Sequence, residues 1–410
     1  MKKGWQTKKL GDVCATIQDG AHESPQRQFD SPGKGRFLYI TSKNIRNNCL
    51  DLGNVSYVEE DFHNRIYPRC KPSAGDVLLT KDGANTGNVT LNTLDEPFSL
   101  LSSVCLIKTK PDALKPSFLS YYIQSPDGLK SITGQMTGAA IKRIILRDIK
   151  LAPIPVPSLP EQQRIVGILD EAFESIATAK ANAEKNLKNA RALFESHLQA
   201  VFTQRGEGWE EKQLSELCDI KHGFAFDGEF FSNEGEYVLL TPGNFYEAGG
   251  YRDRGQKQKY YTGEIPRDYV LNEGDLLVAM TEQAAGLLGS PILVPEPDKF
   301  LHNQRLGLVT KKPGIPWINE FFFHVFNTHA VRKEIHGSAS GVKVRHTSPT
   351  KIGDVVVSFP TVISEQRAIV STLKDLHAET QRLESICQHK LAALGELKKS
   401  LLHQAFSGKL

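Results

Sequence analysis

The chain repeats itself after 204 residues. Near the start of each copy five residues recur with the same spacing: Gly4, Trp5, Lys8, Leu10 and Cys14, then Gly208, Trp209, Lys212, Leu214 and Cys218. Farther along, Pro160-Glu161-Gln162-Gln163-Arg164-Ile165-Val166 returns as Ser364-Glu365-Gln366-Arg367-Ala368-Ile369-Val370. Because the period holds at both ends, the chain is a tandem duplication of about half its length. We therefore expect two similar folds with pseudo-two-fold symmetry, whose two surfaces can recognise a two-part target.

Each copy begins with a module of mixed pattern, the first module at 1–157 and the second module at 207–361. Short apolar runs such as 37–40 are separated by Gly, Pro, Asn and Asp turns, which predicts strands. Segments such as 117–124 predict short helices, and prolines keep the end of each module extended. These patterns predict the α/β class, with a mixed α+β fold for each module.

A long helix is predicted after each module, at 158–206 and 362–410. Residues 161–204 and 364–406 contain no proline and little glycine, and apolar residues recur every three and four positions. At ~1.5 Å per residue each helix would span roughly 60 Å, more than one small domain covers. We therefore predict an antiparallel coiled coil; an amphipathic helix packed only on its own module is the alternative. The predicted interface residues are Val166, Leu169, Phe173, Ile176, Lys180, Leu187, Phe194, Val370, Leu373, Glu384, Leu391, Leu394 and Leu401.

Two charged residues interrupt this apolar stripe at equivalent positions near the middle of each helix, Lys180 and Glu384. If antiparallel helices meet middle to middle, these opposite charges approach each other, and we predict that contact. A buried pair would help to fix the register of the helices. Two solvated side chains at a widened seam are the alternative, and such an exposed pair contributes only ~0–1 kcal/mol.

Charge is divided unevenly between the two copies. Residues 1–206 carry 27 Lys and Arg against 21 Asp and Glu, a net charge of +6, whereas residues 207–410 carry 23 against 26, a net charge of −3. A purely non-specific nucleic-acid binder is basic throughout, so any basic face for DNA must be local. The six separated cysteines form no Cys-x-x-Cys pair, and residues 4–12 supply no apolar leader core, so we expect a reduced, cytoplasmic protein.

Motifs for several classes of catalysis are missing from the sequence. It has no Gly-x-x-x-x-Gly-Lys-Ser/Thr loop, no Gly-x-Ser-x-Gly elbow and no His-Glu-x-x-His motif. It also lacks the Asn-Pro-Pro-Tyr type of tetrapeptide with which an amino-methyltransferase holds a flipped base. The twelve histidines are scattered without metal-binding spacing. We therefore expect no catalytic residue, no metal site and no cofactor bound by this chain.

Several motifs, in order and duplicated, resemble those of the specificity subunit of type I restriction–modification enzymes. They are Trp5 with 10–13 and its echo at Trp209 with Leu214, 75–79 with 274–277, the Glu-Gln helix starts at 161–166 and 365–370, and the tail 401–410. Each motif alone is weak, but together with two long helices they cover nearly the whole chain.

The resemblance implies a division of labour between this chain and its partners. Each module would be a target-recognition domain for one half of a split double-stranded DNA site, and the coiled coil would set the unread gap. Two methyltransferase subunits, which bind S-adenosylmethionine, would dock on the helices. Two restriction subunits, which use ATP and magnesium, would join for cleavage. Because the modules differ strongly in sequence, an asymmetric site is expected, since identical halves would recognise a palindrome.

Polar loops at equivalent positions of both modules are the predicted DNA contacts. Base recognition uses forked or amide side chains, and phosphates are bound by Lys, Arg and backbone N–H groups. The alternative is that they are ordinary turns, which need the same Gly, Asn and Asp residues. The predicted DNA-binding residues are His22, Lys43, Asn44, Arg46, Lys81, Asp82, Asn85, Lys142, Arg143, His222, Asn244, Glu282, Gln283, Lys343, Arg345 and His346.

Three other functions remain open at this stage. The chain could be a coiled-coil scaffold that does not bind DNA, or an enzyme of another type. It could also be the specificity subunit of a nuclease-free phage-defence methyltransferase.

Overall fold

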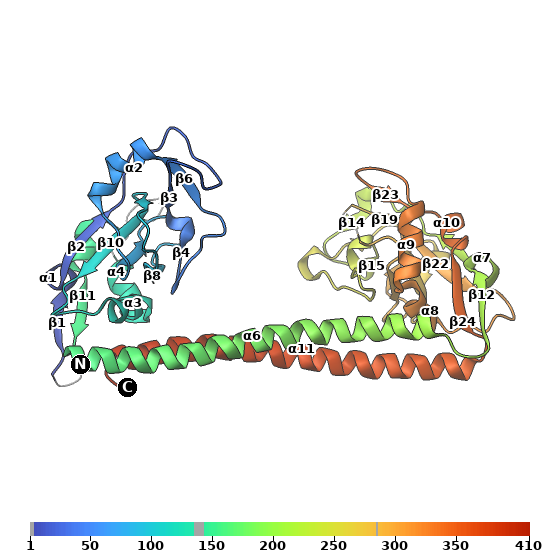
Figure 1. The fold of residues 1–410 in the computed structure, drawn as a ribbon. Coiled ribbons are helices and arrows are strands. Elements are labelled where there is room, and N and C mark those ends of the chain that lie inside the picture. The colour runs from blue at the N-terminus through green and yellow to red at the C-terminus, as the bar shows by residue number, and fades with distance from the viewer. Residues whose placement is uncertain (1–3, 135–142, 284–285) are drawn as a thin grey trace. The chain divides into compact units, whose positions relative to one another are not determined.

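The computed structural model describes residues 4–134, 143–283 and 286–410, which form two compact units (Figure 1). Unit 1 consists of Met1–Glu184 and Gln388–Leu410, and unit 2 of Lys185–Cys387. Each unit therefore contains one module together with one part of each long helix. The sequence instead predicts each long helix as a separate segment, at 158–206 and 362–410.

Unit 1 is built around an antiparallel four-stranded sheet. The strands of unit 1 as a whole are β1 (Gln6–Lys9), β2 (Cys14–Asp19), β3 (Arg36–Ile40), β4 (Ile45–Arg46), β5 (Cys49–Leu50), β6 (Ser56–Glu59), β7 (Val77–Thr80), β8 (Val89–Leu91), β9 (Ser99–Leu100), β10 (Val104–Thr109) and β11 (Pro153–Val156). Its short helices are α1 (Leu10–Val13), α2 (Glu60–Ile66), α3 (Pro116–Gln124), α4 (Pro126–Thr133) and α5 (Leu146–Leu151). The central sheet has the order β2-β10-β7-β8, and β6-β3-β9 and β1-β11 form smaller sheets.

Strand β7 is buried on both faces of the sheet. Val77 and Leu79 lie in one apolar cluster with α3, whereas Leu78 lies in another with Ile40 and Leu106. Alternate side chains of a strand point to opposite faces, so an uninterrupted apolar strand is what a sheet covered on both sides requires. The sheet is thereby fixed at the centre of the module, and its strand ends carry the surface loops.

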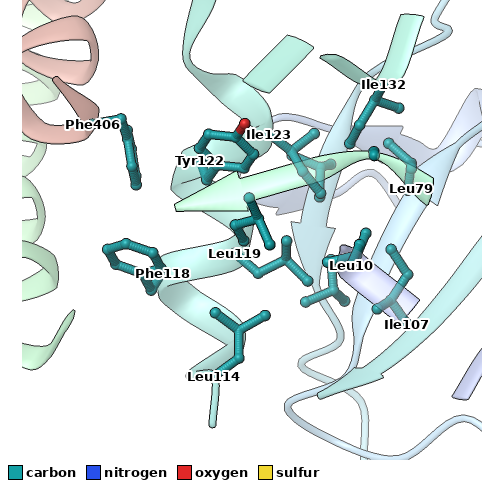
Figure 2. Packing of buried hydrophobic residues seen from close by; sticks show 14 of the residues in the cluster. Leu10, Leu79, Ile107, Leu114, Phe118, Leu119, Tyr122, Ile123, Ile132 and Phe406 are labelled. Atoms are coloured by element: carbon teal, nitrogen blue, oxygen red, sulfur yellow. The ribbon is translucent and has the colours of Figure 1, made fainter. Parts of the chain in front are cut away.

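Helix α3 joins the module to the end of the second long helix, α11 (Ile363–Phe406). The Phe406 ring lies 5.1 Å from the ring of Phe118 and 5.3 Å from that of Tyr122, both edge to face (Figure 2). The other face of α3 packs Leu119 toward the sheet residue Ile107. Aromatic pairs of this geometry add about 0.5–1.5 kcal/mol beyond the area they bury, so the module is held firmly on the helix end.

Unit 2 repeats this plan. Its strands are β12 (Trp209–Gln213), β13 (Cys218–His222), β14 (Phe231–Ser232), β15 (Tyr237–Leu239), β16 (Tyr260–Tyr261), β17 (Val270–Leu271), β18 (Leu276–Ala279), β19 (Thr281–Glu282), β20 (Pro291–Leu293), β21 (Phe300–Leu301), β22 (Leu306–Lys311), β23 (Arg345–His346) and β24 (Val356–Pro360). Its short helices are α7 (Leu214–Leu217), α8 (Asn319–Phe326), α9 (His329–Ser338) and α10 (Pro349–Gly353). The order β13-β22-β18-β20 matches that of unit 1, and β12-β24 matches β1-β11. The second module differs in having a five-stranded side sheet, β14-β16-β15-β21-β17.

The long helices α6 (Leu159–Gln204) and α11 pack antiparallel within each unit. In unit 1, Arg164 donates to the backbone oxygen of Leu410, and the Nζ of Lys398 lies 4.7 Å from the Phe173 ring centre. In unit 2, the Nε of Arg191 lies 3.0 Å from the Glu384 carboxylate, and the Phe194 ring lies 4.9 Å from the ring of His377. In both units the residue number rises along α6 as it falls along α11, which defines the antiparallel direction.

Burial of the predicted helix interface is uneven. The buried members are Val166, Leu169, Phe173, Ile176 and Leu373. The half-buried members are Lys180, Leu187, Phe194, Val370, Glu384, Leu391, Leu394 and Leu401. On α11 the stripe also carries the exposed His377 and the half-buried Lys398. Fewer of the predicted interface residues are therefore buried on α11 than on α6.

The predicted contact between Lys180 and Glu384 would join two different units and stays a prediction, but each of these residues has a charged neighbour within its own unit. The Glu384 carboxylate is bound by the Nε of Arg191 at 3.0 Å, within unit 2. Arg191 lies about three turns farther along α6 than Lys180. In unit 1, Lys180 instead lies near Lys398; burial first, and then the charge of Lys180, lower the pKa of Lys398. Within its own unit, each of the two charges therefore lies beside a residue of the partner helix other than the one predicted.

Among the described residues, none of the helices combines the length and the apolar character needed to span a lipid bilayer.

Candidate nucleic-acid interface

In each module, polar loops meet at one end of the central sheet. In unit 1, the amide of Lys81 donates to the carbonyl of Ser103, and that of Ile144 donates to the carbonyl of Lys81. In unit 2, the backbone amide of Met280 donates to the carbonyl of Arg305, and the amide of Thr347 donates to the carbonyl of Met280. These matched bonds make Lys81 equivalent to Met280, Ser103 to Arg305 and Arg143 to His346. We call the two groups of loops loop cluster 1 (19–22, 41–46, 81–87 and 143–144) and loop cluster 2 (222–224, 241–244, 280–283 and 343–347).

A glycine lets the first loop of each cluster leave the sheet. A Cβ on Gly20 would lie 2.1 Å from the carbonyl oxygen of Leu100, and one on Gly223 would lie 2.3 Å from that of Asn303. Real side chains do not fit at such distances, so both positions need glycine for close backbone approach. The residue before each glycine, Asp19 or His222, is thereby placed at the centre of its cluster.

Loop cluster 1 contains a buried network of charges around Asp19. Its carboxylate accepts from Arg69 Nη2 at 2.7 Å and lies 3.4 Å from the Nζ of Lys81. His22 Nε2 lies 3.0 Å from Oδ2, the carboxylate oxygen that also faces Lys81. Burial alone would raise the pKa of Asp19, but the hydrogen bond from Arg69 and the charge of Lys81 hold it below its ordinary value. Asp19 is therefore ionised at neutral pH and fixes the basic side chains around it.

A second acidic residue, Asp82, continues this network toward solvent. Its Oδ2 lies 3.8 Å from Lys81 Nζ and 3.2 Å from Arg143 Nε. Asp82 is only 8% exposed, whereas the Arg143 side chain is 56% exposed. A buried carboxylate therefore holds an arginine that faces outward.

Loop cluster 2 has a hollow where loop cluster 1 has this charge network. The hollow has a volume of about 480 Å³ and is lined by His222, Thr281, Gln304, Arg305 and His346 among others. The side chains of His222, Gln304, Arg305 and His346 are exposed. The same point of the framework thus presents salt-bridged arginine in one module and open amide, guanidinium and imidazole groups in the other.

Glu282 anchors the neighbouring loop of the second module. One carboxylate oxygen, Oε2, accepts from the amides of Gly286, Leu287 and Leu288 at 2.9–3.1 Å. The other, Oε1, accepts from Arg345 Nη1 at 3.2 Å. The Glu282 side chain is 1% exposed, so it holds the loop and does not present itself to a ligand.

The repeat and this shared framework have counterparts in known proteins. The family described as Type I restriction modification DNA specificity domain matches residues 2–189 and 206–388, one match for each copy of the repeat. The chain belongs to this family.

Two relatives cover the whole chain. The type I restriction enzyme StySPI specificity subunit of Salmonella potsdam is 23% identical over 100% of this chain and 90% of its own length. A putative type I restriction enzyme specificity subunit of Methanocaldococcus jannaschii is 20% identical over 99% of this chain and 93% of its own. The matches with these relatives therefore include both copies of the repeat.

Solved structures share the fold. A structure described as the basis of complex assembly and conformational transition of the type I R-M system superposes with a TM-score of 0.76, at 19% identity, over 100% of this chain and 99% of that one. The HsdS subunit from Thermoanaerobacter tengcongensis gives a TM-score of 0.63 at 18% identity, over 100% and 98%.

The predicted DNA-binding residues of this family member divide by exposure. Eight are exposed, and Arg345 is half-buried. The exposed residues are His22, Lys43, Arg46, Arg143, His222, Gln283, Lys343 and His346. Asn85 is half-buried and donates to the carbonyl of Ser42. Lys142 lies outside the described residues. The exposed residues remain the predicted DNA contacts.

Five predicted contacts are buried, and we reassign them to holding the loops. They are Asn44, Lys81, Asp82, Asn244 and Glu282. Asn44 and Asn244 play the same part: each accepts from the amide three residues earlier, Thr41 or Thr241, at 3.0 Å. Their side chains are 1% and 0% exposed, so they shape a turn and cannot reach a ligand without unfolding it.

Three residues that lie against the two loop clusters were missed by the sequence analysis. Arg69 binds Asp19 although it lies 50 residues away in the chain. Gln304 and Arg305 line the hollow from the turn before β22. A Gln-Arg pair in a turn next to a predicted strand was the available signal, since both side chains suit base recognition.

Proposed function

We propose that this chain is the sequence-specificity subunit of a type I restriction–modification complex, in which the two modules bind the unlike halves of a split, asymmetric DNA site. The observation that carries this proposal is one backbone framework built twice with different exposed side chains. At matched backbone positions, Arg143 corresponds to His346 and Ser103 to Arg305. Different donors at the same place recognise different base edges.

The exposure of the cluster residues supports direct contact with DNA. Exposed cations in loop cluster 1, such as Lys43 and Arg46, suit phosphate binding, which positions a protein on the duplex. In the second module, Lys343 of loop cluster 2 and Arg305 in the lining of the hollow offer the same chemistry. Local cations of this kind are sufficient even though the second copy is acidic overall.

We propose that α6 and α11 form an antiparallel coiled coil that sets the gap between the half-sites. The antiparallel contacts of Phe173 with Lys398 and of Arg191 with Glu384 support it. A paired helix is stiffer than a single one, and a fixed length of helix can define a fixed number of unread base pairs.

The catalytic steps belong, in this proposal, to partner subunits. Two methyltransferase subunits would dock on the helices and bring S-adenosylmethionine, and two restriction subunits would bring ATP and magnesium. The chain itself would contribute recognition and no catalytic group. Family membership supports this assignment, because the family is defined by DNA specificity.

The test is genome-wide mapping of adenine methylation by single-molecule sequencing, in cells that express the methyltransferase with and without this chain. A split, asymmetric motif that disappears without the chain is the expected result. Active methyltransferase with no motif that depends on the chain would favour a scaffold that does not recognise DNA. Restriction of unmodified phage DNA, measured in parallel, distinguishes a full restriction system from a nuclease-free methyltransferase.

A further inference from the structure

Arg143 is held at two points in unit 1. Its backbone forms an antiparallel bridge with Asp82, and the next amide, of Ile144, donates to the carbonyl of Lys81 at 2.8 Å. Its side chain is bound through Nε by Asp82 Oδ2 at 3.2 Å. Both the origin of the side chain and its direction are therefore fixed by the same residue.

Asp82 is itself held in place by buried charged residues in the interior of the module. It lies next to Lys81, whose side chain is 5% exposed and which also contacts the buried Asp19 carboxylate. Asp19 in turn is bound by Arg69. A chain of buried, paired charges is costly to move, because removing one partner leaves an uncompensated charge in the interior. The carboxylate that binds Arg143 is thus held rigidly by these ion pairs.

The outer end of the guanidinium remains available. The contact with Asp82 runs through Nε, and 56% of the Arg143 side chain is exposed. A planar fork of two N–H groups matches the O6 and N7 acceptors of guanine in the major groove. Binding a phosphate needs only charge and does not require such a rigid mount.

We propose that Arg143 recognises a guanine in the half-site bound by the first module, and that Asp82 is the positioning residue that orients it. This inference rests on the proposed function of the chain. The second module lacks the device at the equivalent place, because His346 and Thr281 occupy the matching positions and form no ion pair among the described residues. The guanine is therefore specific to one half-site.

The first experiment maps the methylation motif for the complex containing Arg143→Lys. Lysine keeps the charge and loses the fork, so one guanine position of one half-site should relax, while the other half-site and the gap stay the same. The matched control is Arg65→Lys: Arg65 also binds a carboxylate, that of Glu23, through Nε at 3.2 Å, and its side chain is 58% exposed. Its motif should equal that of the unaltered complex.

The second experiment removes the guanine acceptor instead of the arginine. Binding of the complex to a duplex carrying 7-deazaguanine at that position, which lacks the N7 acceptor, should weaken by about 5-fold to 150-fold. Arg143→Lys should be nearly insensitive to the change. Asp82→Asn should show an intermediate loss at that position only, because the arginine is still present but is no longer fixed.

The outcomes separate this proposal from the proposed function. A split motif that depends on the chain but has no G·C pair in the affected half-site, or that is unchanged by Arg143→Lys, would overturn the guanine assignment alone. Uniformly weaker binding to all sequences, with a shallower salt dependence, would also overturn it and make Arg143 a phosphate contact. Absence of any motif that depends on the chain would overturn the proposed function itself.

Discussion

The side chain of Gln366 makes in unit 2 the same three hydrogen bonds that Gln162 makes in unit 1. Each amide nitrogen donates to two carbonyl oxygens, those of Ala113 and Pro157 for Gln162 and those of Pro316 and Pro360 for Gln366, at 2.8–3.0 Å. Each amide oxygen accepts from a backbone amide, of Lys115 or Ile318. Both side chains are 0% exposed. The glutamine of the repeated Glu-Gln motif thus hydrogen-bonds the start of each long helix to its module. We call this set of three hydrogen bonds the glutamine lock.

Loss of this lock should destabilise the unit that contains it. Gln162→Ala leaves two carbonyls and one amide without their partner, and an unsatisfied buried group costs about 1–3 kcal/mol. We expect the free energy of unfolding of unit 1 to fall by at least that amount, measured by urea unfolding. The neighbouring Gln163 is exposed, so Gln163→Ala is the matched control. Equal effects of the two substitutions would show that the lock carries no stability.

The sequence predicts the framework well, because each signal there is local or repeated. The apolar run at 37–40 is confirmed as part of strand β3, and the predicted helix at 117–124 is α3. The long helices are found at α6 and α11. Duplication helps, since a weak pattern that recurs after 204 residues is unlikely to be accidental.

The sequence does not reveal which loop residues face outward. Asn44 and Asn85 both lie in polar loops, but Asn44 is buried because Asp51 and Asn54 offer carbonyls that its amide binds. Asparagine suits turns and base recognition equally. The presence of an asparagine therefore does not show whether it shapes a turn or contacts DNA. The pairing of Lys81 with Asp19 depends on the strand order, which brings distant residues together. Burial of this kind follows from tertiary packing alone.

Unit 2 should lose stability in mild acid. Burial lowers the pKa of His302 to about 4, and burial followed by the charge of His377 lowers that of His324 to about 4. Between pH 6.5 and 4 the unfolded chain binds these protons and the folded unit does not, so stability is full above pH 6.5 and falls toward pH 4. The loss is on the order of 3 kcal/mol for each histidine.

The measurement is urea unfolding of the chain across this pH range. His324→Phe keeps an aromatic ring beside Phe194 and should flatten the pH dependence by about one proton. His346 is exposed, so His346→Gln should leave the slope unchanged. A slope that His324→Phe does not alter would contradict the assignment of the titration to this ring.

The hollow of loop cluster 2 should determine the half-site of the second module. Arg305→Ala removes an exposed cation from its lining and should weaken DNA binding by about 1–3 kcal/mol if the side chain contacts a base. The methylation motif should then relax at one position of one half-site. Arg267 is exposed on another part of the module, so Arg267→Ala serves as the control. A motif unaffected by Arg305→Ala would place the base contacts elsewhere.

The length of the helix pair should set the gap between the half-sites. Four residues inserted after Glu184 in α6, with four more after Cys387 in α11, lengthen both helices at the unit boundary and leave Gln162 and Gln366 in place. Each insertion adds about 6 Å of helix, or roughly two base pairs at 3.4 Å per step. The methylation motif should keep both half-sites while the unread gap grows by about two. Insertion in α6 alone is the control, since it shifts the helices out of register and should reduce methylation without creating a longer motif. A gap that stays the same in the doubly lengthened chain would mean that the helices do not measure the distance between the half-sites.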